Sequence, residues 1–346
     1  ELTDTMKSKI TITLIAILLC AVISYGFVLS RTSQNDISYD NPDGIVGTMS
    51  LSGPQLVAEI APGLVFKIDT GSDLSTITAE GLAILEKMGY NPRKEIYPVL
   101  GRNGVGDIQL SATRYKIDLP FHHKVYENDS TTYNEIINVI HNVDFAPSKN
   151  GLSVLGIDFL QKFKIEYQYH NKALNLYVKL PAGYVQCVDL SYSKALMTSI
   201  WLGKRYYIPI SIESDENNYF IDTGLQKVGI KLPYHEVKRT LRPLYTDTVL
   251  SARGQYSALI DHSAILSCGD RGGAYTAYYY DNDEEEFAMN PFNLFTQDVL
   301  IDFIDLKLYL RPTYNIPKRK SPESAPTSQH SDSPFLVNKP KWPRSD

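Results

Sequence analysis

Two stretches of the sequence each place a carboxylate between an apolar run and a glycine. The first is Phe66-Lys67-Ile68-Asp69-Thr70-Gly71-Ser72, and the second is Tyr219-Phe220-Ile221-Asp222-Thr223-Gly224. The apolar runs are typical of strands and the glycines of turns. One such stretch would indicate a turn that contains an acid. Because each half of the chain has one, we expect Asp69 and Asp222 to be brought together.

Two carboxylates held within hydrogen-bonding distance would act as an acid–base pair. They cannot both ionise cheaply, so they share one proton. The ionised member can act as a general base on a water between them, and the protonated member can polarise a carbonyl and protonate a leaving amine. The glycines, Gly71 and Gly224, allow tight turns that aim backbone amides at the carboxylates. The hydroxyls of Thr70 and Thr223 can bond across to the partner loop and lock the acids together.

The segments that follow the two acid motifs correspond in order and spacing, as expected of an internal duplication. A helical patch comes first, at residues 79–88 and 234–241, and a glycine-bearing hairpin follows, at residues 101–106 and 253–256. Each half closes with a pair of strands, FKIEYQYHNKALNLYV in the first half and VLIDFIDLKLYL in the second. We therefore predict two homologous lobes.

The composition favours strands over helices. The chain has 24 tyrosines and many Val, Ile and Thr residues, and short apolar runs alternate with Gly, Pro and Asn, which predicts an all-β fold. The candidate strands are residues 56–60, 64–68, 97–100, 108–110, 115–119, 136–143, 163–169, 173–178, 206–212, 218–221, 248–250, 257–260, 274–280, 299–303 and 307–310.

Over residues 46–312 the chain resembles the aspartic peptidase superfamily, specifically a single chain with two retropepsin-like lobes of the bacterial type. Both acid motifs carry the resemblance. A further motif of the family, two apolar residues and a glycine that brace the acid loop, matches Val154-Leu155-Gly156, which runs into Ile157-Asp158-Phe159-Leu160. The resemblance implies the bilobal acid-protease fold, with two β-barrel lobes and a cleft between them.

The resemblance also implies an activity, the hydrolysis of peptide bonds by an aspartic endopeptidase. An extended substrate would lie between flap hairpins and the acid pair, bound by strand addition. No cofactor is implied, and one chain supplies both acids, so a monomer is sufficient. The implied roles are catalytic for Asp69 and Asp222; support of the pair for Thr70, Gly71, Ser72, Thr223 and Gly224; brace for Leu155 and Gly156; and flap or substrate contact for Gly101, Asn103, Gly104, Gly254 and Tyr256.

The second half departs from the family pattern in three ways. Leu225 replaces the small or hydroxylic residue that usually follows the glycine, where it would lie close to the carboxylate of Asp222. Met289-Asn290-Pro291-Phe292 stands where the brace motif is expected, with Asn290 in place of its glycine. The second flap has one glycine where the first has three. These departures support an alternative function, that of a catalytically weak or inactive peptidase-like protein that binds peptides or partner proteins. A third possibility is that each lobe pairs with a lobe of another chain.

The N-terminal region contains a candidate membrane segment. Residues 10–29 are apolar and uncharged, with Lys7 and Lys9 before them and Arg31 after them. This length suits a spanning helix or a long signal peptide. Because the region around Ser24 offers a poor cleavage site, we favour an uncleaved transmembrane helix, and the lysines predict that the rest of the chain is extracytoplasmic. A cleaved segment would make the protein secreted.

The expected organisation has five parts: a membrane anchor or signal peptide at 1–30, a linker at 31–45, lobes at 46–181 and 182–312, and a disordered tail at 313–346. The tail is rich in Pro, Ser and Lys and holds too few apolar residues to offset its ordering entropy.

Other classes of function find little support. The net charge of -5 leaves no basic footprint for nucleic acid. His122 and His123 are adjacent on an expected strand and would face opposite sides, so no metal site is predicted. The cysteines form no disulfide framework, because Cys20 lies in the apolar N-terminal run. At most Cys187 and Cys268 could pair, and they could equally be two buried thiols.

Overall fold

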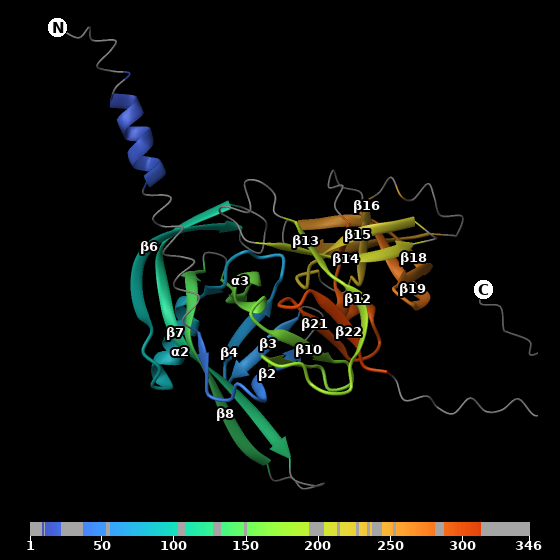
Figure 1. Ribbon diagram of the computed structural model, residues 1–346, viewed down its shortest axis with the longest axis horizontal. Helices are drawn as coiled ribbons and strands as arrows, with labels where there is room; N and C mark the ends of the chain where they lie inside the picture. The colour runs from blue at the N-terminus through green and yellow to red at the C-terminus, as the bar shows by residue number, and fades with distance from the viewer. Residues whose placement is uncertain are drawn as a thin grey trace, which may run out of the picture. The chain divides into compact units, whose positions relative to one another are not determined.

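The computed structural model describes residues 9, 11–21, 37–52, 56–102, 108–126, 133–148, 151–193, 204–212, 215–225, 228–233, 236, 244–251, 254–280 and 287–312. These residues form a mostly β protein (Figure 1), as the composition predicts. Helices are few and short among them. The labelled helices are α2 (Ala79–Lys87), α3 (Ile157–Leu160) and α5 (Pro291–Leu294), and residues 11–21 are also helical.

The larger sheet has 14 strands among the described residues and takes strands from both halves of the chain. Its strand order is β12-β22-β21-β10-β11-β2-β3-β4-β9-β5-β8-β7-β6, and β1 pairs with β8. The bounds are β1 Ser38–Tyr39, β2 Ile45–Ser52, β3 Val57–Ala61, β4 Leu64–Ile68, β5 Thr76–Ile77, β6 Arg93–Arg102, β7 Ile108–Tyr126, β8 Tyr133–Pro147, β9 Val154–Leu155, β10 Lys164–Gln168, β11 Ala173–Tyr177, β12 Val185–Asp189, β21 Val299–Asp302 and β22 Lys307–Leu310.

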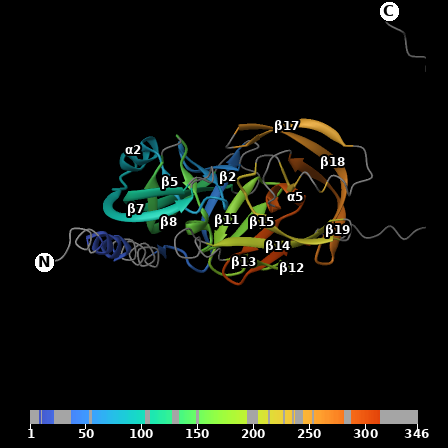
Figure 2. The same ribbon diagram turned by 90° about the horizontal axis from the view of Figure 1, so that it is seen from above.

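The second sheet has eight described strands, all from the second half, in the order β13-β14-β15-β20-β16-β19-β18-β17. Figure 2 shows β17, β18 and β19 running beside one another. The bounds are β13 Ser191–Ser193, β14 Arg205–Ile212, β15 Asp215–Ile221, β16 Ile230–Pro233, β17 Tyr245–Ser251, β18 Gly254–Cys268, β19 Arg271–Tyr280 and β20 Ala288–Met289.

The strand pairing repeats from the first half to the second. The strand before each acid motif pairs in parallel with a two-residue strand, β4 with β9 and β15 with β20. A second short strand in each half, β5 or β16, pairs antiparallel with that two-residue strand and parallel with a longer one. The hairpins β6–β7 and β17–β18 also correspond. Corresponding strands of the two halves therefore pair in the same way, as the internal repeat in the sequence predicts.

The closing strands of the two halves meet in the larger sheet. Ile165 of β10 and Ile301 of β21 are direct antiparallel partners, so an approximate two-fold axis passes between them. Lys164 crosses this junction, because its ammonium group bonds to the carboxylates of Asp302 and Asp305. The two halves consequently share one sheet, and one hydrophobic core that contains both Phe66 and Tyr219 runs through both.

The alternating pattern of β4 explains how the first acid is presented. Leu64, Phe66 and Ile68 are buried, whereas Val65 is exposed and Lys67 is half-buried. Because successive side chains on a strand point to opposite faces, the apolar set packs into the core and the next residue on the other face is Asp69.

Three differences from the expected elements have physical causes. The candidate strands 108–110 and 115–119 are parts of one long strand, β7, since no turn residue separates them. The expected linker at 31–45 is not wholly a tether, because Ser38 and Tyr39 pair with β8 and the Tyr39 ring packs against Phe163. The candidate strands do not include β2, β12 and β16, nor the strands of two or three residues, β1, β5, β9, β13 and β20. Each is short or rich in small and polar residues, and pairing rather than periodicity defines it.

Several expected segments lie largely or wholly outside the described residues. They are the second helical patch at 234–241, of which only Glu236 is described, the tail at 313–346, and the ends of the N-terminal apolar run. No helix in the part of the chain that the structure describes combines the length and apolar character needed to cross a membrane.

Candidate active site

The two acid motifs lie at the ends of corresponding strands, β4 and β15. The amide of Asp69 donates to the carbonyl of Leu155 at 3.1 Å, and the amide of Asp222 donates to the carbonyl of Met289 at 2.8 Å. Each acid loop is thus tied to the short parallel strand beside it, β9 or β20. The same local structure therefore presents both carboxylates.

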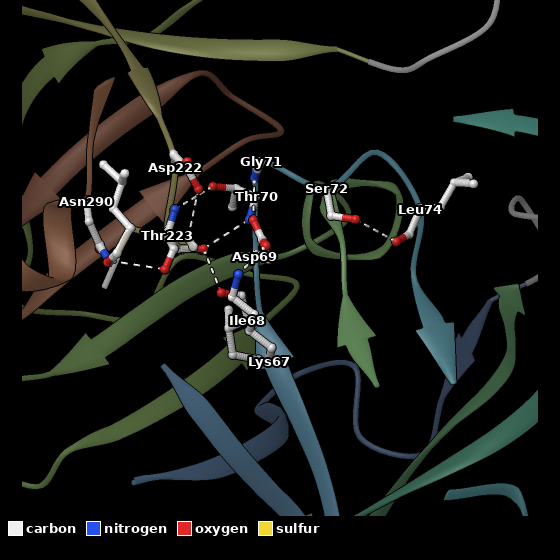
Figure 3. Close-up of polar contacts among 12 residues, drawn as sticks. Lys67, Ile68, Asp69, Thr70, Gly71, Ser72, Leu74, Asp222, Thr223 and Asn290 are labelled. Atoms are coloured by element: carbon white, nitrogen blue, oxygen red, sulfur yellow. Dashed lines mark hydrogen bonds and ion pairs between the residues drawn. The ribbon is translucent and has the colours of Figure 1, made fainter. Parts of the chain in front are cut away.

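Reciprocal hydrogen bonds join the two loops (Figure 3). The amide of Thr70 donates to the Thr223 hydroxyl at 3.0 Å, and the amide of Thr223 donates to the Thr70 hydroxyl at 3.0 Å. The Thr70 hydroxyl donates to the Ile221 carbonyl at 2.7 Å, and the Thr223 hydroxyl donates to the Ile68 carbonyl at 3.1 Å. All four bonds are buried, so the threonines tie each loop to the other as their spacing predicts.

The carboxylates of Asp69 and Asp222 share one small region between the loops. The amides of Gly71 and Gly224 donate to the Oδ1 atoms of Asp69 at 2.9 Å and Asp222 at 2.8 Å, respectively. A Cβ atom added at Gly71 would lie 2.8 Å from Asp222 Oδ1 and 3.1 Å from Asp69 Oδ1. One added at Gly224 would lie 2.6 Å from Asp69 Oδ1. Both glycines are therefore required by the close approach of the partner carboxylate.

A lysine that we did not assign to the site contacts the first carboxylate. Lys67 Nζ donates to Asp69 Oδ2 at 2.7 Å, and the two side chains are 12% and 3% exposed. Burial alone would lower the Lys67 pKa, but the charges of Asp69 and Asp222 and the bond to Asp69 outweigh it, so the net pKa is raised. The sequence did hold a signal: residues two apart on a strand share a face, which places Lys67 beside Asp69.

The predicted brace of the first loop is present. The amide of Ile157 donates to the Ser72 carbonyl at 2.8 Å, which holds the brace against the acid loop. A Cβ atom at Gly156 would lie 2.7 Å from the Leu74 carbonyl carbon and 2.8 Å from the Ser72 carbonyl oxygen, so only glycine fits. The Ser72 hydroxyl donates to the Leu74 carbonyl at 2.9 Å.

A buried polar network stands behind this brace. Asp158 accepts from both the amide and the hydroxyl of Ser75, at 2.8 and 2.6 Å, and the Ser75 hydroxyl accepts from the Gly156 amide at 3.0 Å. Arg114, 1% exposed, pairs with Asp144 at 2.9 Å and reaches Asp158 at 3.9 Å. No motif in the sequence marks Ser75, Arg114 or Asp144. Their contacts join residues far apart in the chain, which no local pattern reveals.

In the second half, Asn290 takes the place of the brace glycine. The parallel register aligns Met289 with Ile221 as it aligns Leu155 with Ile68, so Asn290 corresponds to Gly156. Its buried amide donates to the carbonyls of Thr223 and Leu225, each at 3.2 Å. A side chain thus supports this loop.

Leu225 packs into an apolar cluster beside the second loop. The cluster is formed by Val228, Ala258 and Tyr280, and Leu225 and Tyr278 pack against it. The Leu225 carbonyl is the acceptor for Asn290 described above. Apolar packing therefore accounts for leucine at this position.

The predicted flap residues are only partly described. Gly101 lies near the end of β6, and Gly254 and Tyr256 lie at the start of β18, so both expected hairpins are present. Asn103, Gly104 and the side chain of Tyr256 lie outside the described residues. No cluster of three or more metal-ligating side chains occurs among the residues described.

Comparison with known proteins gives no family for this chain. No family model matches it, and no curated protein does. Among solved structures it is similar to basic 7S globulin from soybean, with a TM-score of 0.44 and 10% identity over 80% of this chain and 94% of that one. It is also similar to conglutin gamma, a basic 7S globulin from lupine seeds, with a TM-score of 0.41 and 10% identity over 76% and 93% of the two chains. Scores of this size do not define the fold, which rests on the strand order and register described above.

Proposed function

We propose that this chain is an aspartic endopeptidase with two retropepsin-like lobes, in which Asp69 and Asp222 act together on a water molecule. The observation that carries the proposal is the reciprocal bonding of Thr70 and Thr223, which brings the two carboxylates to one place. Independent Asp-Thr-Gly turns would have no reason to exchange buried hydrogen bonds with each other.

In the proposed reaction, the ionised carboxylate removes a proton from the water while the water oxygen attacks the peptide carbonyl carbon. The protonated carboxylate donates to the carbonyl oxygen, and the leaving amine takes the proton that the base collected. The bonds from the Gly71 and Gly224 amides keep the carboxylates aimed at the water. The hairpins β6–β7 and β17–β18 would hold an extended substrate by strand addition.

The first test is cleavage of a mixed peptide library by the full chain across the acidic pH range, read by mass spectrometry. We expect Asp69→Asn and Asp222→Asn each to abolish cleavage. Asp189→Asn, a change at an exposed acid of β12, serves as the matched control and should leave cleavage unchanged. Cleavage that survives either site variant would refute the acid pair as the catalyst.

A second candidate is a protein that binds peptides without cutting them, and the contact of Lys67 with Asp69 favours it. An ammonium group on one carboxylate competes with the water and substrate for that acid. Binding of a fluorescent peptide library by the wild type, with every peptide recovered intact from pH 3 to 7, would favour this function over hydrolysis.

We also propose the extracytoplasmic location, which rests on the apolar run at residues 10–29 and the lysines before it. Because that location can be periplasmic or on the cell surface, digestion of spheroplasts with an added protease tests it. The chain should be cleaved while a cytoplasmic marker protein stays intact, and complete protection would place the chain in the cytoplasm.

A further inference from the structure

Lys67 is directed at the acid pair by the strand that carries it. On β4 the face that points away from the core holds Val65 and Lys67, and Asp69 follows directly after the strand. The neighbours of Lys67 across the sheet are Val57 of β3 and Val154 of β9, both apolar. The charge of Lys67 is therefore compensated at the acid pair, where Asp69 accepts its hydrogen bond.

The contact distinguishes the two oxygens of Asp69. Oδ1 accepts from the Gly71 amide, while Oδ2 accepts from Lys67. Both oxygens of Asp69 thus receive a donor, and one donor is a cation. Charge-assisted bonds of this kind favour the ionised carboxylate.

The corresponding position in the second half is Phe220. It pairs with Ala288 of β20 as Lys67 pairs with Val154 of β9, and it stands two residues before Asp222. The Phe220 side chain is buried and carries no charge, and Cζ of the Arg205 guanidinium lies 4.9 Å from the centre of its ring. The repeat therefore has a lysine two residues before the first acid and a phenylalanine two residues before the second.

We propose that Lys67 is a positioning residue that keeps Asp69 ionised, which assigns the general base to Asp69 and the shared proton to Asp222. Asp69 takes a proton from water as the water oxygen bonds to the peptide carbon, and Asp222 gives its proton to the carbonyl oxygen. When the C–N bond breaks, the amine takes the proton from Asp69 and a hydroxyl of the intermediate returns one to Asp222. This assignment rests on the proposed function.

The same contact sets the working pH. A positive charge beside the pair favours ionised carboxylates, so the contact should move the pH range of peptide cleavage downward. The charged groups that act on Lys67 are Asp69 and Asp222. The Arg205 guanidinium lies over the ring of Phe220 in the second half. Because the Lys67 pKa is raised, the lysine stays protonated throughout the acidic range. The acidic and the basic limb of the pH–rate profile should thus both lie at lower pH than in an acid pair without the lysine.

The test compares the full chain with Lys67→Met, Lys67→Arg and the control Lys179→Met, whose lysine pairs with Asp43 at the surface. Peptide cleavage against pH is measured for each, together with the titration of ¹³C-labelled aspartate carboxyls. Lys67→Met should move both limbs upward by about one pH unit or more. Lys67→Arg, which keeps the charge, should move them less, and Lys179→Met should not move them. A Lys67→Met profile and titration that superimpose on the wild type would overturn the inference.

The carboxyl titration separates this inference from the proposed function. In the wild type, Asp69 should titrate below Asp222, with the two signals assigned from Asp69→Asn and Asp222→Asn. The reverse order would overturn the inference even if Lys67→Met does not fold. If the two carboxyls titrate in the expected order and Lys67→Met shifts their titration, but no peptide is cleaved, Lys67 is a counter-ion and the peptidase proposal fails. If peptides are cleaved but neither the order of titration nor the effect of Lys67→Met is as expected, the peptidase proposal is supported and the proposed role of Lys67 is wrong.

Discussion

The amide of Thr70 donates to the hydroxyl of Thr223, and the amide of Thr223 donates to the hydroxyl of Thr70, each at 3.0 Å. These residues come from different halves of the chain. The exchange is symmetric, because each hydroxyl also donates to the carbonyl of the residue before the partner acid. The geometry of the two loops and the position of the acid pair therefore depend on the same four hydrogen bonds.

Removing either hydroxyl should weaken both the fold and the site. Thr70→Val keeps the shape of the side chain but leaves the buried Thr223 amide and Ile221 carbonyl without this partner, which costs about 1–3 kcal/mol for each group. Urea unfolding should show the loss, and peptide cleavage should fall with it. Thr246→Val, at an exposed position of β17, should stay within about 0.5 kcal/mol of the wild type. Equal stability of the two variants would contradict the prediction.

Gly156 should tolerate no side chain. In Gly156→Ala the new Cβ atom would meet backbone atoms of Leu74 and Ser72 at 2.7–2.8 Å, and backbone cannot move aside as a flexible side chain can. We expect a loss of about 1–3 kcal/mol or failure to fold, measured by thermal unfolding. The matched control is Gly272→Ala, where the nearest atom would lie at an ordinary 3.5 Å. A Gly156→Ala protein as stable as the control would show that the loop has room to relax.

Glu166 should make stability depend on acidic pH. It is fully buried; burial would raise its pKa, but bonds from Tyr184, Asn175 and Tyr177 and the charge of Arg311 bring the net pKa below the ordinary 4.5. The carboxylate thus stabilises the fold above pH 4.5, and that contribution is lost as the pH falls through the lower folded value.

Glu166→Gln measures this contribution. The variant should be less stable than the wild type by about 1–3 kcal/mol at pH 7, and the difference should shrink at pH values below the folded pKa. Urea unfolding at a series of pH values checks both points, with the exposed Glu216→Gln as the control. A difference that does not change with pH would mean that packing, rather than charge, is what Glu166 supplies.

Cys187 and Cys268 should form a disulfide under oxidising conditions. Their sulfur atoms lie 3.6 Å apart, and the bond between the thiols lowers the Cys187 pKa, so Cys187 ionises first. With oxidised glutathione, the Cys187 thiolate would form a mixed disulfide that Cys268 then displaces, yielding two reduced glutathiones. The product should lose two mass units and gain up to about 4 kcal/mol of stability. Cys187→Ser should show neither change, and a wild type that keeps both thiols free would contradict the prediction.

The sequence by itself determined the parts whose signals are local. Short apolar runs directly before the acids mark β4 and the end of its counterpart β15, the glycines mark the turns, and the repeat of Asp-Thr-Gly in matching contexts identifies Asp69 and Asp222 as a pair. It also pointed to Asn290 as the substitute for the missing glycine, because that residue follows the second short apolar run.

Only the tertiary structure decided which atoms meet. Strand alternation places Lys67 on the same face as Asp69, but whether an ammonium group reaches the carboxylate depends on how β3 and β9 enclose it. The contacts of Arg114 with Asp144 and Asp158, and of Cys187 with Cys268, join residues from separate helices and strands, so no periodicity encodes them. The physical reason is general: apolar runs and glycine turns are properties of residues adjacent in the sequence, whereas the partner of a buried charge is chosen by tertiary packing.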